Sequence, residues 1–95
     1  MKISDIHYGT NDINITAKVV EVGDAREVKT RFGQTLVCNA TVEDETGQIK
    51  LTLWGKQIDN VKKGSTVVIE KGYVREFGGD IFVNVGRNGK LEIQQ

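Results

Sequence analysis

Apolar and polar residues alternate with a period of two along most of the chain, which is typical of β-strands with one buried face. The alternation predicts five strands, which cover residues 13–19, 35–42, 48–54, 66–73 and 81–85. Asp44-Glu45-Thr46-Gly47 and Gly78-Gly79-Asp80 have the composition of tight turns between strands. Five short strands in 95 residues favour one all-β domain that closes into a barrel, because closure leaves no exposed strand edge.

Two of the connections carry further predictions. Between the third and fourth strands, Ile58 and Val61 are spaced i, i+3 and are followed by Gly64. This spacing predicts a short helical turn that caps the barrel. The connection between the first and second strands, residues 23–33, is long and polar, and we expect it to project as a flexible arm.

The single tryptophan, Trp54, is predicted on the solvent face of the third strand. Ile49, Leu51 and Leu53 share the parity of the core, and neighbouring residues of a strand point to opposite faces. Trp54 and Lys50 therefore point outward together. The alternative is that Trp54, at the end of its strand, folds over the mouth of the barrel and joins the core.

A second aromatic cluster follows in the fourth strand. Four side chains of one parity alternate between cationic and aromatic, namely Lys71, Tyr73, Arg75 and Phe77. Val67 and Ile69 have the same parity, so a regular strand would send the whole set into the core. Gly72 provides a position for a bulge, which would reverse the facing of the residues after it. Without such a bulge, Tyr73 and Phe77 would be packed core residues.

Phe82 is a further surface candidate, because Ile81 and Val83 on either side of it have the parity of the core. Exposed aromatic rings beside cations suit a single-stranded nucleic acid, since rings stack on any base and cations neutralise the backbone. The candidate phosphate contacts are Arg26, Lys29, Arg31, Lys50, Lys56, Lys71 and Arg75. On the arm, the alternative is that the cations are ordinary solvated charges partly neutralised by Asp24 and Glu27.

The charge balance argues only partly against nucleic-acid binding. Thirteen basic and thirteen acidic residues give a net charge of zero, whereas nucleic-acid-binding domains usually have a basic excess. The charges are unevenly placed, because residues 48–75 carry a net charge of +4 and residues 21–47 carry −3. We therefore expect binding to depend on stacking more than on net charge.

The sequence offers no site for chemistry. One cysteine, Cys38, and one histidine, His7, provide neither a disulfide nor a zinc site. The acidic residues 43–45 alternate between strand faces, and Gly78-Gly79 lacks the following helix of a phosphate-binding loop. We expect no enzymatic activity, metal or cofactor. No apolar run approaches the about 20 residues of a membrane span, so we expect no membrane contact. A single cysteine rules out an internal disulfide, and residues 1–5 lack the apolar stretch of a signal peptide, so we expect a reducing, intracellular compartment.

The run D-E-T-G-Q-I-K-L-T-L-W-G-K at residues 44–56 closely resembles the archaeal single-stranded DNA-binding proteins that consist of one OB fold. Human sensors of single-stranded DNA and, more distantly, replication protein A are relatives of these proteins. The resemblance extends over nearly the whole chain, including residues 25–33, residues 63–67, and Gly72-Tyr73 followed by Phe77.

The resemblance implies a single OB-fold domain over residues 1–95, with a five-stranded barrel. It implies that bases stack on Trp54, Tyr73 and Phe77, and that the protein coats single-stranded DNA in replication, recombination and repair, in the cytoplasm at the nucleoid. The family often has tryptophan at the position of Tyr73. Its members usually continue into a tail that recruits replication or repair proteins, whereas this sequence ends at Gln95.

Two alternatives from other classes stay open. Stacking alone does not sense the 2′-hydroxyl, so an OB module that binds RNA or tRNA would present the same aromatic face. An OB subunit for protein–protein interaction would instead bury Trp54 against another chain.

Overall fold

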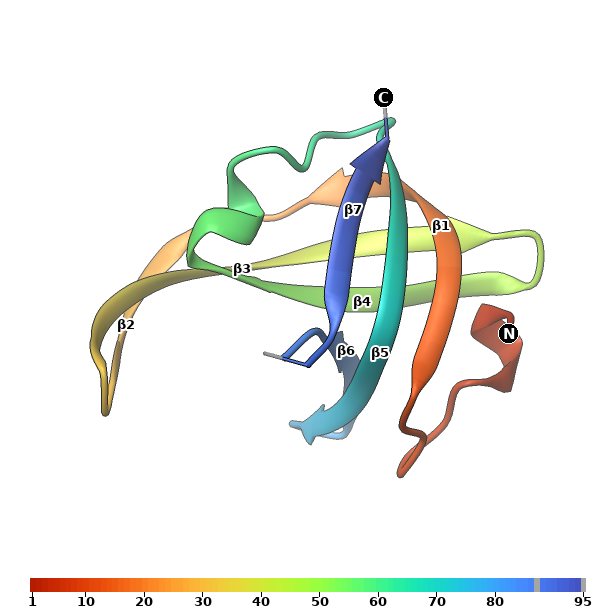
Figure 1. Cartoon of the computed structure of the whole chain (residues 1–95), viewed down its shortest axis with the longest axis horizontal. Helices are drawn as coiled ribbons and strands as arrows, with labels where there is room; N and C mark the ends of the chain where they lie inside the picture. The colour runs from red at the N-terminus through yellow and green to blue at the C-terminus, as the bar shows by residue number, and fades with distance from the viewer. Residues whose placement is uncertain (87, 95) are drawn as a thin grey trace.

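Seven β-strands and two short 3-10 helices make up the described residues, 1–86 and 88–94, of the computed structural model (Figure 1). In chain order they are η1 (Ile3–Asp5), β1 (Ile13–Val22), β2 (Arg26–Thr30), β3 (Gly33–Asp44), β4 (Gly47–Trp54), η2 (Gly55–Ile58), β5 (Thr66–Phe77), β6 (Asp80–Asn84) and β7 (Lys90–Gln94). No helix in this part of the chain is long and apolar enough to cross a bilayer.

Five of the strands close into a ring. Their order is β1-β3-β4-β6-β5, and β5 pairs again with β1. The β4–β6 pair is parallel, whereas the other four pairs of the ring are antiparallel. The predicted all-β fold with a closed five-stranded sheet is therefore confirmed.

The interior of the ring is filled by alternate residues of its strands. The predicted parity holds in β1 and β4, where the inward side chains are Ile13, Ile15, Ala17, Val19, Ile49, Leu51 and Leu53. Burying each large aliphatic side chain stabilises the fold by about 1.5–3 kcal/mol. Alternation in the strand predicted at residues 35–42 gives Leu36 the core parity of Cys38, Ala40 and Val42, but this expectation is wrong for Leu36, which is 46% exposed. It lies opposite Glu27 of β2, beyond the part of β3 that belongs to the ring.

A bulge in β5 turns the second half of this strand around. Ile69 and Gly72 pair with β1 residues that are only two positions apart, so β5 carries one extra residue. Lys71, inside the bulge, has a φ of 55°, in the left-handed region. Gly72 is buried, and a Cβ there would lie 3.0 Å from Ile69 Cγ2. The expected change of register near Gly72 is present, and it turns Tyr73 outward.

The connection expected to be a flexible arm is a β-hairpin, which corrects that prediction. β2 pairs with the start of β3 from Arg26 opposite Val37 to Thr30 opposite Gly33. Gly33 has a φ of 111°, and the Thr30 hydroxyl donates a 2.8 Å hydrogen bond to the Gly33 carbonyl oxygen across the turn. The hairpin extends away from the ring (Figure 1). The two strands of the hairpin pair with each other through a regular antiparallel register of five residue pairs.

Two further elements pack against the ring. The predicted helical turn is present as η2 between β4 and β5, and it is followed by the buried Val61, while Ile58 is partly buried against the core. β7 was not predicted. It pairs with β5 from Thr66 opposite Gln94 to Glu70 opposite Lys90.

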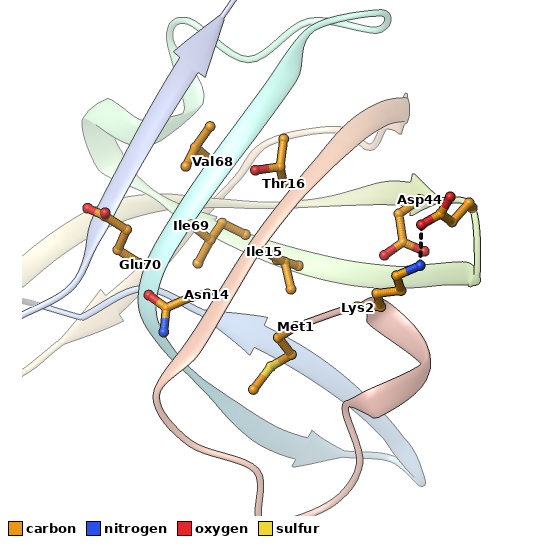
Figure 2. A pocket seen from close by; sticks show the side chains of 10 residues that line it. Met1, Lys2, Asn14, Ile15, Thr16, Asp44, Val68, Ile69 and Glu70 are labelled. Atoms are coloured by element: carbon orange, nitrogen blue, oxygen red, sulfur yellow. Dashed lines mark hydrogen bonds and ion pairs between the residues drawn. The ribbon is translucent and has the colours of Figure 1, made fainter.

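The N-terminus is attached to the turn between β3 and β4. The Ile3 N–H donates a 2.8 Å hydrogen bond to Asp44 Oδ2, and the Ser4 N–H donates to Thr46 Oγ1 at 3.0 Å. Figure 2 shows the Lys2 side chain reaching to the same turn. The Asp-Glu-Thr-Gly part of the sequence motif therefore holds η1 against the ring.

Candidate nucleic-acid interface

The outward side chains of β3, β4, β6 and β5 form a row across the sheet. Thr41 is opposite Lys50, Lys50 is beside Phe82, and Phe82 is opposite Arg75. The half-buried ring of Phe82 therefore lies between two cations, with Lys50 Nζ 6.0 Å from the ring centroid. A cation at this distance is attracted to the face of the ring. The row combines one stacking surface with two positive charges.

A second group of outward side chains lies around Asn84 of β6. The indole Nε1–H of Trp54 donates a hydrogen bond to Asn84 Oδ1 at 3.1 Å, and Tyr73 is the cross-strand partner of Asn84. Asn84 is buried, whereas Trp54 is 36% and Tyr73 38% exposed. Trp54 is thus bonded to Asn84 and Tyr73 lies opposite it on β5, each with part of its surface in solvent.

The end of β4 is fixed from both sides. The Trp54 N–H donates a 3.0 Å hydrogen bond to Gln57 Oε1 from η2. Val37, the β3 partner of Trp54, is buried although it has the outward parity. Directly opposite residues on one face of an antiparallel pair pack together, so Trp54 covers Val37. The indole has a fixed position and still presents a third of its surface.

Phe77, Lys56 and Lys71 are the other predicted site residues near these aromatic rings. Phe77, at the end of β5, is 76% exposed and pairs with Asp80. Lys56 lies exposed in η2, two residues after Trp54. Lys71 occupies the bulge beside Tyr73 and is also exposed. Phe77 and Lys56 lie at or just beyond the ends of β5 and β4, whereas Lys71 lies within β5.

The three cations of the β2–β3 hairpin do not lie together. Arg26 is opposite Val37, which in turn is opposite Trp54, so Arg26 continues the row of Trp54. Lys29 has the opposite parity and lies on the other face of the hairpin. Arg31 lies in the turn at the tip. The structure therefore joins Arg26 to the aromatic face and separates Lys29 from it.

Sequence reasoning missed Phe32 at the tip of the hairpin. This side chain is 83% exposed. It lies in a segment expected to be a flexible arm, so no strand parity pointed to it. β3 continues beyond the ring, where Gln34 and Thr35 pair with β2. Phe32 lies in the turn at the far end of this extension. Phe32 adds an aromatic ring near the cations of the hairpin.

The described residues contain no group of three His, Cys, Asp or Glu side chains that could hold a metal ion. The thiol of Cys38 is buried and donates to the Gly23 carbonyl oxygen at 3.1 Å. Burial raises the pKa of the Cys38 thiol, and the charge of Asp24 adds to this effect. Such a thiol is a poor nucleophile, because the thiolate is the reactive form.

A hollow on another part of the surface has a different chemistry. It lies between the N-terminus, the outer side of β1 and the first half of β5, and Figure 2 shows Met1, Asn14 and Glu70 around it. Asp44 and Glu45 line it as well, and no aromatic side chain does. Carboxylates repel phosphates, so this hollow is a poor place for a nucleic acid.

Comparison with known proteins agrees with this geometry. The family model for single-stranded DNA-binding protein Ssb-like, OB fold, matches residues 6–93. The single-stranded DNA binding protein Ssb of Saccharolobus solfataricus is 36% identical over 90 residues, which are 95% of this chain. The chain spans 61% of the length of that relative.

Two solved structures have the same fold. The OB domain of a Thermoplasma acidophilum protein superposes with a TM-score of 0.83 at 24% identity, over 97% of this chain and 83% of that one. The second OB-fold domain of replication protein A from Methanococcus maripaludis gives a TM-score of 0.78 at 27% identity, over 98% and 92% of the two chains. The closed ring of strands is therefore an OB fold.

Proposed function

The chain belongs to the Ssb-like OB-fold family of single-stranded DNA-binding proteins, and on this basis we propose that it binds single-stranded DNA with little sequence preference and without catalysis. Its role would be to protect the strand in replication, recombination and repair. The observation that carries the proposal is the aromatic face, where Trp54, Tyr73 and Phe82 lie among Lys50 and Arg75.

Stacking supplies most of the affinity in this proposal. Bases would stack on Trp54, Tyr73 and Phe82, and on Phe77 at the end of β5. Each stacked base contributes roughly 1–3 kcal/mol, so three of these four rings, if occupied, give about 3–9 kcal/mol before the cost of ordering the strand. With help from phosphate contacts this corresponds to binding at about micromolar concentrations. A net charge of zero is compatible with such binding.

The cations along the face would contact the backbone between stacked bases. Lys50 and Arg75 lie on either side of Phe82, and Arg26 continues the row of Trp54 onto the hairpin. Lys56 follows Trp54 in η2, and Lys71 precedes Tyr73 in the bulge of β5. A duplex hides the faces of its bases, so this arrangement favours single strands. Affinity should fall as salt rises, because phosphate contacts release counterions.

The test is fluorescence anisotropy of a labelled thymine oligomer, with unlabelled single-stranded DNA, duplex DNA and RNA as competitors. We expect the single strand to compete at least tenfold better than the duplex. Equal competition by the duplex would contradict the proposal. Equal or better competition by RNA of matched sequence would assign the face to RNA binding instead. No binding to any nucleic acid would favour a protein partner for the aromatic face.

A further inference from the structure

The β2–β3 hairpin has an open outer edge. β2 pairs with β3, and within residues 1–86 and 88–94 no second strand pairs with its other side. The hairpin extends away from the ring (Figure 1), and three of the five residues of β2 are exposed. An open strand edge can pair with a strand of another chain. Which strand it accepts depends on its backbone groups and its side chains.

The turn of the hairpin determines which backbone groups of β2 face outward. Thr30 and Gly33 are partners across a two-residue turn, in which the first carbonyl oxygen accepts from the last N–H. Backbone groups along a strand point alternately to one neighbour and to the other. Thr30 and Val28 therefore bond to β3, whereas Glu27 and Lys29 present their N–H and C=O groups to the open edge.

The side chains of this edge are complementary to a second copy of β2. When two copies run antiparallel with Val28 opposite Val28, Glu27 of each copy lies opposite Lys29 of the other. Both side chains are exposed, and opposite charges directly across an antiparallel pair attract. The same two residues have the outward backbone groups, so each pair also exchanges both of its N–H···O bonds.

Neighbouring registers lack this complementarity. A shift of one residue would oppose outward backbone groups with inward ones, so only shifts of two residues compete. One such shift places Glu27 opposite Glu27, and the other places Lys29 opposite Lys29, where like charges repel. Pairing two copies of β7 about its central residue would likewise place Glu92 opposite Glu92. β2 thus specifies one register for one partner.

Within one chain, neutral residues face these charges. The β3 partners of Glu27 and Lys29 are Leu36 and Gln34, so the hairpin itself does not require the alternation of charge. Continued past the strand, the same register brings the tip residue Phe32, which is 83% exposed, against the segment before β2 in the other copy. The pairing therefore also covers apolar surface.

We propose that β2 joins a second copy of this chain through this symmetric pairing, which combines the two hairpins into one four-stranded sheet. The interface is isologous, and its two-fold axis is perpendicular to the sheet, so both copies turn the same face to the same side. Arg26 shares the face of Trp54, so both aromatic faces look to this side. A contact made mainly by one short strand belongs below the about 1,200 Å² of stable complexes, and we expect a weak dimer.

Sedimentation velocity of the free protein tests the pairing. The parent should form a dimer as its concentration rises from about 0.1 to 1 mM, which corresponds to a weak association. Glu27→Lys and Lys29→Glu each place like charges opposite one another twice, so either should raise the dissociation constant about fivefold or more. The double variant restores opposite charges and should dimerise like the parent. Because Leu36 and Gln34 are neutral, the hairpin should fold in all three variants.

Asp59→Lys makes the same change of charge as Glu27→Lys at an exposed position outside the hairpin, and it should dimerise like the parent. A parent that stays monomeric over this range would overturn the proposal, as would a double variant that dimerises no better than the single ones. These measurements contain no nucleic acid, so neither outcome affects the proposed single-strand binding.

The symmetry has a consequence that rests on the proposed single-strand binding. A two-fold axis reverses the direction of a strand bound to the second copy, so the dimer holds two strands of opposite polarity. An immobilised thymine oligomer should capture a second, labelled oligomer through the parent and through the double variant, and less through Lys29→Glu. A dimer that binds the first oligomer but captures no second one would overturn the shared orientation of the faces.

Discussion

The indole N–H of Trp54 donates a 3.1 Å hydrogen bond to Oδ1 of Asn84, and Asn84 is buried between the strands that carry the aromatic face. Asn84 is also the cross-strand partner of Tyr73, so the amide that orients the Trp54 indole lies beside the second ring. A ring that is already oriented loses less freedom when a base stacks on it, which favours affinity.

Asn84→Ala should release the Trp54 indole and lower the affinity for single-stranded DNA about threefold to tenfold, with a loss of about 1 kcal/mol in the free energy of unfolding. Trp54 emission in the free protein should report the change in its surroundings. Asn39→Ala is the matched control, since Asn39 accepts from the Thr52 hydroxyl on the same sheet and has no bond to an aromatic ring. Equal losses of affinity in the two variants would show that the indole bond has no special role.

Phe82→Leu should weaken single-strand binding by about fivefold to tenfold, in line with the loss of roughly 1–3 kcal/mol of stacking. Phe82 is half-buried between Lys50 and Arg75, so leucine keeps most of its apolar contacts. The thermal midpoint should therefore change little. Competition binding and thermal unfolding measured on the same sample separate the two effects. Unchanged affinity would remove Phe82 from the stacking surface.

Arg26→Gln and Lys29→Gln compare the two faces of the β2–β3 hairpin. Arg26 continues the row of Trp54, so its removal should lower affinity and reduce the slope of log K against log salt by about 0.7, the value for one phosphate contact on a single strand. Lys29 lies on the other face and should have the smaller effect. Salt titrations of both variants compare the two losses of affinity. A larger loss for Lys29→Gln would contradict the assignment of Arg26 to the face of Trp54.

Asp44 should make the attachment of the N-terminus depend on pH. Desolvation acts to raise the pKa of Asp44, but hydrogen bonds from the Thr46 hydroxyl and from the N–H groups of Ile3 and Thr46 outweigh it and lower the pKa. A lowered folded-state pKa stabilises the protein above the unfolded pKa of about 3.9, and the benefit is lost as pH falls through the folded value.

The measurement is the thermal midpoint of the parent and of Asp44→Asn between neutral and acidic pH. The parent should be the more stable at pH 7, and the difference should shrink below about pH 4. Asp59→Asn, at an exposed position without these bonds, is the control. A difference that stays constant down to about pH 2 would mean that ionised Asp44 has no role.

Parity along the strands was enough to predict the closed sheet and the outward position of Trp54, and Gly72 marked the place where a change of facing could occur. Each of these depends on local alternation or on one glycine. The β2–β3 hairpin could not be predicted in the same way. Most of its side chains are exposed on both faces, so it lacks the apolar alternation by which a half-buried strand is recognised.

The roles of Asn84 and Asn14 were also beyond the sequence. Asn84 has an outward parity that suggests exposure, yet the Trp54 indole covers it. Asn14 joins Asp12 to the β5 bulge, 57 residues further along the chain. Both contacts arise from the closure of the sheet, and no local sequence pattern predicts them. The same holds for β7, whose two apolar residues only meet the core through pairing with β5.

The emission of Trp54 tests the central claim most directly, because this residue is the single tryptophan of the chain. A thymine oligomer is titrated into the protein while the anisotropy of a label on the oligomer reports binding in the same cuvette. Stacking predicts that Trp54 emission is quenched in step with binding, and that Trp54→Ala binds at least fivefold more weakly. Binding that leaves the emission unchanged, together with full affinity of Trp54→Ala, would contradict the account.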